Sequence, residues 1–145
     1  MIKVKGRWFV SLYGPDGTEK QNIEGDNVIT QNGLSGLVSH LVEATVAATT
    51  FTFQYIGIGA ASGAASSTDS VLGAELARTT GTVSQIAGGI YRVTATFPSG
   101  GAGSVSEYAL FDSSAAGTMF SRDVESVVNK LADDTLTVQT EVTFS

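Results

Sequence analysis

The feature that most constrains the fold is an alternation of apolar and polar residues in short runs. In residues 135–144, leucine, valine and phenylalanine alternate with threonine, glutamine and glutamate. A period of two places apolar side chains on one face of a β-strand and polar side chains on the other. Residues 2–13 show the same period, with basic residues and serine opposite the apolar residues Ile2, Val4, Trp8, Val10 and Leu12. Both runs predict half-buried strands.

Turn signals separate further runs of this kind. Gly14-Pro15-Asp16-Gly17 suits a tight turn, because proline presets φ and glycine tolerates positive φ, so a strand is expected near residues 18–23. Gly88-Gly89 predicts a hairpin between residues 82–87 and 90–97. Three more strands are expected, at residues 51–58, 105–111 and 119–124. About eight strands at regular spacing predict a mainly-β chain folded as an antiparallel β-sandwich.

One short helix is predicted at about residues 33–44. Its apolar residues follow the spacing i, i+3, i+4, i+7 and i+8 of a single helical face, namely Leu34, Leu37, Val38, Leu41 and Val42. Thr30 and Asn32 are the candidate N-cap residues. We expect the apolar face to pack on a sheet.

The composition favours one domain, residues 1–145, and narrows the class of partner. The chain has no cysteine, no apolar run near the roughly 20 residues of a membrane span and no signal-peptide cleavage region, so synthesis in the cytoplasm is expected. The net charge of −6 repels a phosphate backbone, which argues against nucleic acid. Charged residues are 15% of the chain, where about 25% is usual. This suits a homo-oligomer or a component of a larger assembly, although a small secreted β-protein could share it.

The stretch GIGAASG at residues 57–63 follows a predicted strand, which raises the question of a phosphate-binding loop. The glycine spacing is G-x-G-x-x-x-G, and no helical pattern follows to supply free N–H groups. We therefore expect Gly57 and Gly59 to permit close backbone packing. The residues after them, 60–70, and a second segment, 98–104, are loop-like in composition, and both are expected to order only on contact with a neighbour.

No catalytic, cofactor or metal site is predicted. His40, the single histidine, falls on the polar side of the predicted helix without partners for a triad. The acidic residues that could supply paired carboxylates or a calcium site do not have the calcium-loop spacing; they are Asp112, Asp123, Glu125, Asp133 and Asp134. A chain without enzymatic activity is expected.

The candidate partner-contact residues are Lys3, Lys5, Arg7 and Trp8. The three basic residues form a stripe on one strand face, which could meet an acidic neighbour. The alternative is a stripe that keeps an edge strand soluble and unpaired. The N-terminal hairpin, residues 1–25, is accordingly either an attachment element or an ordinary first strand.

The order of several segments resembles a family of small tailed-bacteriophage virion proteins. The resemblance covers about residues 26–145 and is carried by NVITQNGLSGLVSHLV, YIGIG, TDSVLGAELAR, RVTATFPSG, SEYALFD, GTMFSRDV and DDTLTVQTEVTFS. It implies a virion structural protein that binds other virion proteins in a capsid or tail lattice and stabilises it, as a decoration (cement) or tail-associated protein.

The alternative that the sequence leaves open is a receptor- or carbohydrate-binding β-sandwich module of a tail fibre. Such a module would use exposed aromatic rings as stacking surfaces. The candidate residues are Tyr13, Tyr55, Tyr91 and Tyr108. Because all four lie in or beside predicted strands, most of them are expected to belong to the core.

Overall fold

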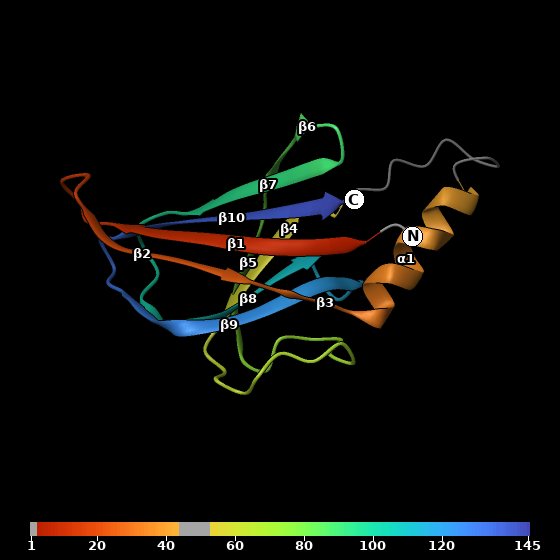
Figure 1. The fold of residues 1–145 in the computed structure, drawn as a ribbon. Helices are drawn as coiled ribbons and strands as arrows, with labels where there is room; N and C mark the ends of the chain where they lie inside the picture. The colour runs from red at the N-terminus through yellow and green to blue at the C-terminus, as the bar shows by residue number, and fades with distance from the viewer. Residues whose placement is uncertain (1–2, 44–52) are drawn as a thin grey trace.

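The computed structural model describes residues 3–43 and 53–145, with the backbone alone for residues 40–43. Two antiparallel five-stranded sheets face each other, and a helix lies at one end (Figure 1). The first sheet has the order β2-β1-β10-β7-β6 and the second β3-β9-β8-β4-β5. The first comprises β1 (Val4–Tyr13), β2 (Glu19–Asp26), β6 (Thr82–Ala87), β7 (Ile90–Phe97) and β10 (Thr135–Phe144). The second comprises β3 (Val28–Ile29), β4 (Tyr55–Gly59), β5 (Glu75–Thr80), β8 (Gly103–Phe111) and β9 (Met119–Lys130).

The predicted antiparallel β-sandwich is confirmed, with ten strands in the described residues instead of about eight. The two additional strands are β3 and β5. Neither has the run of alternating apolar residues from which a strand is predicted. β3 has only two residues, and β5 is exposed along most of its length. β9 also continues past the predicted end at residue 124, to Lys130.

The core lies between the two sheets. The inner face of the first sheet contributes Trp8, Val10 and Leu12 from β1 together with Leu136, Val138 and Val142 from β10. The second sheet contributes Ile56, Ile58, Tyr108 and Leu110. Trp8 has no exposed surface, and its ring centroid lies 6.1 Å from that of Tyr108 on the opposite sheet. Burying each such side chain contributes about 1.5–3 kcal/mol.

β1 is an internal strand, so the edge-strand interpretation of the N-terminal stripe is wrong. It pairs with β10 from Val4 opposite Phe144 to Tyr13 opposite Thr135, and with β2 on its other side. The two ends of the chain are therefore neighbours in the middle of one sheet. The hairpin of β1 and β2 is built into the sandwich.

The helix α1 (Gln31–Glu43) begins with a threonine cap, as predicted for Thr30. The Gly33 N–H donates to the Thr30 hydroxyl oxygen at 2.9 Å, and the Thr30 hydroxyl donates to the Met119 carbonyl at 2.5 Å. A Cβ on Gly33 would lie 2.5 Å from the Phe120 Cα, so the helix crosses β9 at a glycine. Within the described residues, no helix combines the length and the apolar character needed to cross a bilayer.

The prediction that the leucine face of the helix packs on a sheet is wrong for two of its residues. Leu37 is partly buried against the core, but Leu34 is 40% and Val38 60% exposed. The reason is that the helix approaches β9 through Gly33, and this orientation leaves Leu34 and Val38 facing solvent. The side chains of His40, Leu41 and Val42 lie outside the described residues.

Candidate functional site

The four candidate contact residues lie on opposite faces of the first sheet. Lys3 and Lys5 are exposed, and Arg7 is half-exposed on the same outer face. Trp8 points the other way and is completely buried. In this fold, a partner can therefore touch the three basic residues but not the indole.

Acidic residues on the neighbouring strands partly neutralise the basic stripe. Arg7 Nη2 lies 3.1 Å from Glu24 Oε2 on β2. Across the sheet, Arg7 stands opposite Glu141 on β10, and Glu141 forms an ion pair with Arg92 on β7. The outer face is thus a mixed row of charges, and of the basic residues described on it only Lys3 and Lys5 lack a carboxylate partner.

A buried ion pair occupies the outer face of the second sheet, where the sequence had indicated no site. Arg122 Nε and Nη2 donate to Glu107 Oε2 at 3.0 and 2.9 Å, and Arg122 Nη1 lies 2.8 Å from Asp69 Oδ2. Glu107 has no exposed surface, and Arg122 is almost completely buried. The signal that could have found them is a charged residue inside a predicted strand of mainly apolar and small residues, Glu107 in VSEYALF and Arg122 in MFSRDV.

This ion pair holds residues 60–74 against the sheet, where the yellow-green loop of Figure 1 lies. Glu107 accepts backbone hydrogen bonds from Ala61 at 3.2 Å, Gly73 at 3.0 Å and Ala74 at 2.7 Å. Burial opposes the charge of Glu107, but these amides and Arg122 outweigh it, so the pKa of Glu107 lies below its ordinary value. The arrangement is a clasp, named here the Glu107–Arg122 clasp.

The clasp lies against Gly59 of GIGAASG, and it corrects the expectation about the loop. A Cβ on Gly59 would lie 2.7 Å from the Ala74 carbonyl oxygen, and one on Gly57 would lie 2.9 Å from the Phe111 ring. Close packing at both glycines is therefore confirmed. The loop after them is ordered by contacts within its own chain, so the expected dependence on a neighbour is wrong.

The second loop, residues 98–104, is also held from within. The Gly100 N–H donates to the Ala132 carbonyl at 2.7 Å, and Lys130 Nζ donates to the Gly101 carbonyl at 2.5 Å. The expectation that this loop orders only on contact with a neighbour is wrong as well.

Two of the acidic residues raised by the sequence lie together at the edge where β2 approaches β9. Asp123 and Glu125 converge over Gly25, where an added Cβ would clash with Glu125 Oε1 and lie 3.2 Å from Asp123 Oδ2. Asp123 is 4% exposed, and its Oδ2 has no hydrogen-bond donor among the described residues. Burial, then the charge of Glu125, raises the pKa of Asp123 to about 7.

The other acidic residues serve turns or lie at the surface. Asp112 accepts the Thr118 N–H at 2.6 Å, and Asp134 binds Lys20 Nζ at 2.8 Å. Asp133 is exposed. Within the described part of the chain, no group of three or more His, Cys, Asp or Glu side chains is placed to hold a metal ion.

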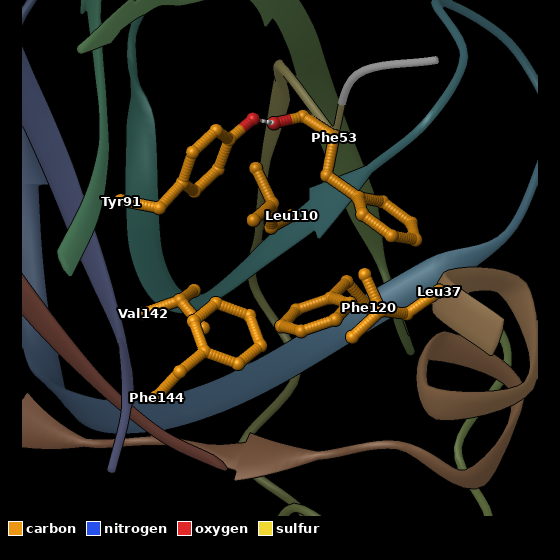
Figure 2. A pocket seen from close by; sticks show the side chains of 7 residues that line it. All are labelled: Leu37, Phe53, Tyr91, Leu110, Phe120, Val142 and Phe144. Carbon is orange, nitrogen blue, oxygen red and sulfur yellow. Dashed lines mark hydrogen bonds between the residues drawn. The ribbon is translucent and has the colours of Figure 1, made fainter. Parts of the chain in front are cut away.

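An apolar pocket of about 220 Å³ opens at the helical end of the sandwich (Figure 2). Its walls come from both sheets and the helix, and they are Leu37, Phe53, Tyr91, Leu110, Phe120, Val142 and Phe144. The Tyr91 hydroxyl turns to the Phe53 carbonyl and donates a hydrogen bond to it. Burial raises the pKa of Tyr91 to about 12. The pocket thus has apolar walls, and its tyrosine hydroxyl is already used within the chain.

The tyrosines do not form a shared stacking surface. Tyr108 is completely buried, and Tyr55 packs partly buried against the cluster of Leu72 and Phe111. Tyr13 borders a shallow surface depression beside Pro15 and Asp133. The expectation that most of these residues belong to the core holds for Tyr55, Tyr91 and Tyr108.

The geometry defines the class of protein as an antiparallel β-sandwich in which a buried ion pair holds one long loop against a sheet. No protein-family model, curated protein or solved structure matches the chain. The resemblance to phage virion proteins therefore stays a prediction.

Proposed function

We propose that this chain is a structural component of a tailed-bacteriophage virion, without enzymatic activity, which binds a capsid or tail lattice and stabilises it. The observation that carries the proposal is the number of large apolar side chains left at the surface of a chain with few charges. They are Leu34, Val38, Val71, Leu76, Val83, Ile86, Val127 and Leu131. Exposed apolar surface is stabilised when a neighbouring subunit covers it.

The mechanism is repeated weak binding. Each copy would cover a small apolar area on the lattice, and the many copies together would hold neighbouring lattice subunits in place, since linked sites raise the effective concentration to about the millimolar range. A rigid sandwich suits this role because its loops are secured internally, so little conformational entropy is lost when it binds. The protein would be made in the host cytoplasm and reside in the virion.

Co-sedimentation with virions and empty capsids of the source phage tests the proposal. The expected result is saturable binding with a fixed number of copies per particle. Leu131→Ser, at a 60% exposed position, should weaken binding while leaving the melting temperature nearly unchanged. A wild-type chain that stays in the supernatant with both kinds of particle would overturn the proposal.

Variants of the basic stripe provide a second test of binding to the lattice. Lys3 and Lys5 lack a carboxylate partner among the described side chains, so an acidic lattice surface is their expected complement. The double variant Lys3→Glu and Lys5→Glu should keep its fold but bind particles more weakly, with a smaller salt dependence. Unchanged binding would remove the stripe from the interface.

The tail-fibre receptor-binding alternative has one favourable observation, Tyr13 at the rim of its depression. A glycan-binding screen with the wild type and Tyr13→Ala would decide it. Binding that depends on Tyr13 would favour this alternative over lattice binding.

A further inference from the structure

Each sheet has two edge strands, and three of the four edges are protected against pairing. An open edge presents unpaired N–H and C=O groups, which proteins usually guard with charges, proline or short strands. β2 carries Glu19, Lys20, Glu24 and Asp26 among its eight residues. β5 carries Glu75 and Arg78, and β3 has only two residues.

The fourth edge, β6, has none of these devices along most of its length. Its sequence TVSQIA contains no charge and no proline, and all six residues are exposed. Val83 is 36% and Ile86 46% exposed. β6 pairs with β7 on one side, and no other described strand pairs with it. A bulge between Gln85 and Ala87 interrupts the ladder at the hairpin end, which leaves Thr82–Gln85 as the regular stretch.

We infer that β6 is a self-association edge, at which a second copy of this chain adds its own β6 in antiparallel orientation across a twofold axis. The two five-stranded first sheets would then join into one continuous sheet of ten strands. This inference does not depend on the virion function proposed above.

The distribution of charge favours a second copy as the occupant. The chain as a whole carries −6, so two copies repel each other wherever their acidic surfaces meet. β6 has no charge to contribute to that repulsion. The charged residue directly across the ladder, Arg92 opposite Ser84, is already neutralised by Glu141. A twofold-related edge is complementary to itself when it carries no like charges, and this edge meets that condition.

Single-cysteine variants test the geometry directly, because the natural chain contains no cysteine. Facing residues of antiparallel strands have Cα atoms about 4.5–5.5 Å apart, which lies within the range that a disulfide spans. Thr82→Cys, Val83→Cys, Ser84→Cys and Gln85→Cys, alone and in mixed pairs, should give cross-linked dimers under mild oxidation, strongest for positions that face each other. Thr80→Cys on the exposed part of β5 is the matched control and should give no cross-linked dimer.

A charge on the edge supplies the second test, in the uncross-linked protein. Gln85→Lys should raise the dimer dissociation constant about tenfold or more in sedimentation equilibrium, because a charge on an edge strand opposes the pairing of a second strand. Thr80→Lys adds the same charge on β5 and should leave the constant unchanged.

Any one of three results would overturn the inference. The first is a wild-type chain that remains monomeric at about millimolar concentration, and the second is a dimer that neither cross-links through residues 82–85 nor responds to Gln85→Lys. The third is a β6 edge whose backbone amides are protected only when a different virion protein is bound. The first two results leave lattice binding open, and lattice binding is measured separately by co-sedimentation.

Discussion

At the scale of single residues, Asp123 has surroundings that strongly oppose its charge. Glu125 lies beside it on β9, Asp26 adds a further negative charge from β2, and Tyr108 supplies a neutral hydroxyl from β8. After burial, the charge of Glu125 contributes most to the raised pKa of Asp123. A proton shared between Asp123 and Glu125 would give the unpaired Asp123 oxygen the donor that it lacks.

The expected consequence is a loss of stability as the pH rises. The pKa of Asp123 is raised from 3.8 to about 7 in the folded chain, so the folded state keeps a proton that the unfolded state releases between these values. The contribution of this group to the free energy of unfolding is therefore largest below about pH 4 and falls until about pH 7. Asp123→Asn should abolish the decrease and stabilise the protein by about 1–3 kcal/mol at pH 8.

Denaturant unfolding between pH 5 and pH 8 measures this effect. Glu107 and Asp134, whose pKa values are lowered, lose their contributions only at lower pH, outside this window. Asp133→Asn, at an exposed position, is the control. Equal stability of the wild type at pH 5 and pH 8 would contradict the prediction.

At the scale of elements, the Glu107–Arg122 clasp joins a loop to a strand. Removing one partner of a buried ion pair leaves the other uncompensated, which costs about 3–5 kcal/mol. Glu107→Gln should therefore destabilise the fold by an amount of this order and release residues 60–74. Faster amide exchange at Ala61, Gly73 and Ala74 would report the release, and Glu24→Gln, in the exposed pair with Arg7 on the other sheet, should leave those amides protected.

The helix offers two glycines with opposite expectations. A Cβ at Gly33 would meet the Phe120 backbone at 2.5 Å, whereas one at Gly36 would make ordinary contacts at 3.4 and 3.5 Å. Gly33→Ala should destabilise the protein by about 1–3 kcal/mol through overpacking. Gly36→Ala should stabilise it by up to about 1 kcal/mol, because alanine has the higher helix propensity. Thermal melts of the two variants check the signs, and a stabilising Gly33→Ala would show that the helix does not rest on β9 at this residue.

At the scale of the whole molecule, the first sheet closes by pairing the two ends of the chain. Val4 stands opposite Phe144, and β1 supplies Trp8, Val10 and Leu12 to the core. Such pairing over long sequence separation forms only when most of the fold is in place. The N-terminal strand is thus a structural necessity, whatever its outer face binds.

Deleting residues 1–22 should consequently abolish cooperative unfolding. The truncated chain would lose three buried side chains and leave β10 with an open edge. Near-ultraviolet circular dichroism and a denaturant melt are the measurements, with Asp16→Ala at the exposed tip of the same hairpin as a folded control. A truncated chain with a sharp transition would show that the sandwich closes without β1.

The sequence by itself determined the features that depend on near neighbours. Alternation at residues 2–13 and 135–144 predicted two strands because side chains point to opposite faces every second residue, whatever the partner. The Gly14-Pro15-Asp16-Gly17 turn and a helix cap at Thr30 or Asn32 followed from local backbone preferences in the same way, and the structure has the cap at Thr30. These features are present in the structure as predicted.

Only the tertiary structure decided which surfaces meet. The helical pattern could not show that Gly33 would approach Phe120 more closely than Leu34 or Val38 could, because the approach depends on a strand almost ninety residues further along the chain. In the same way, the sequence does not show that Glu107, Arg122 and Asp69 meet, because only the fold brings them together. Burial and charge pairing depend on distances in space, and residues far apart in sequence acquire those distances only when the sheets close.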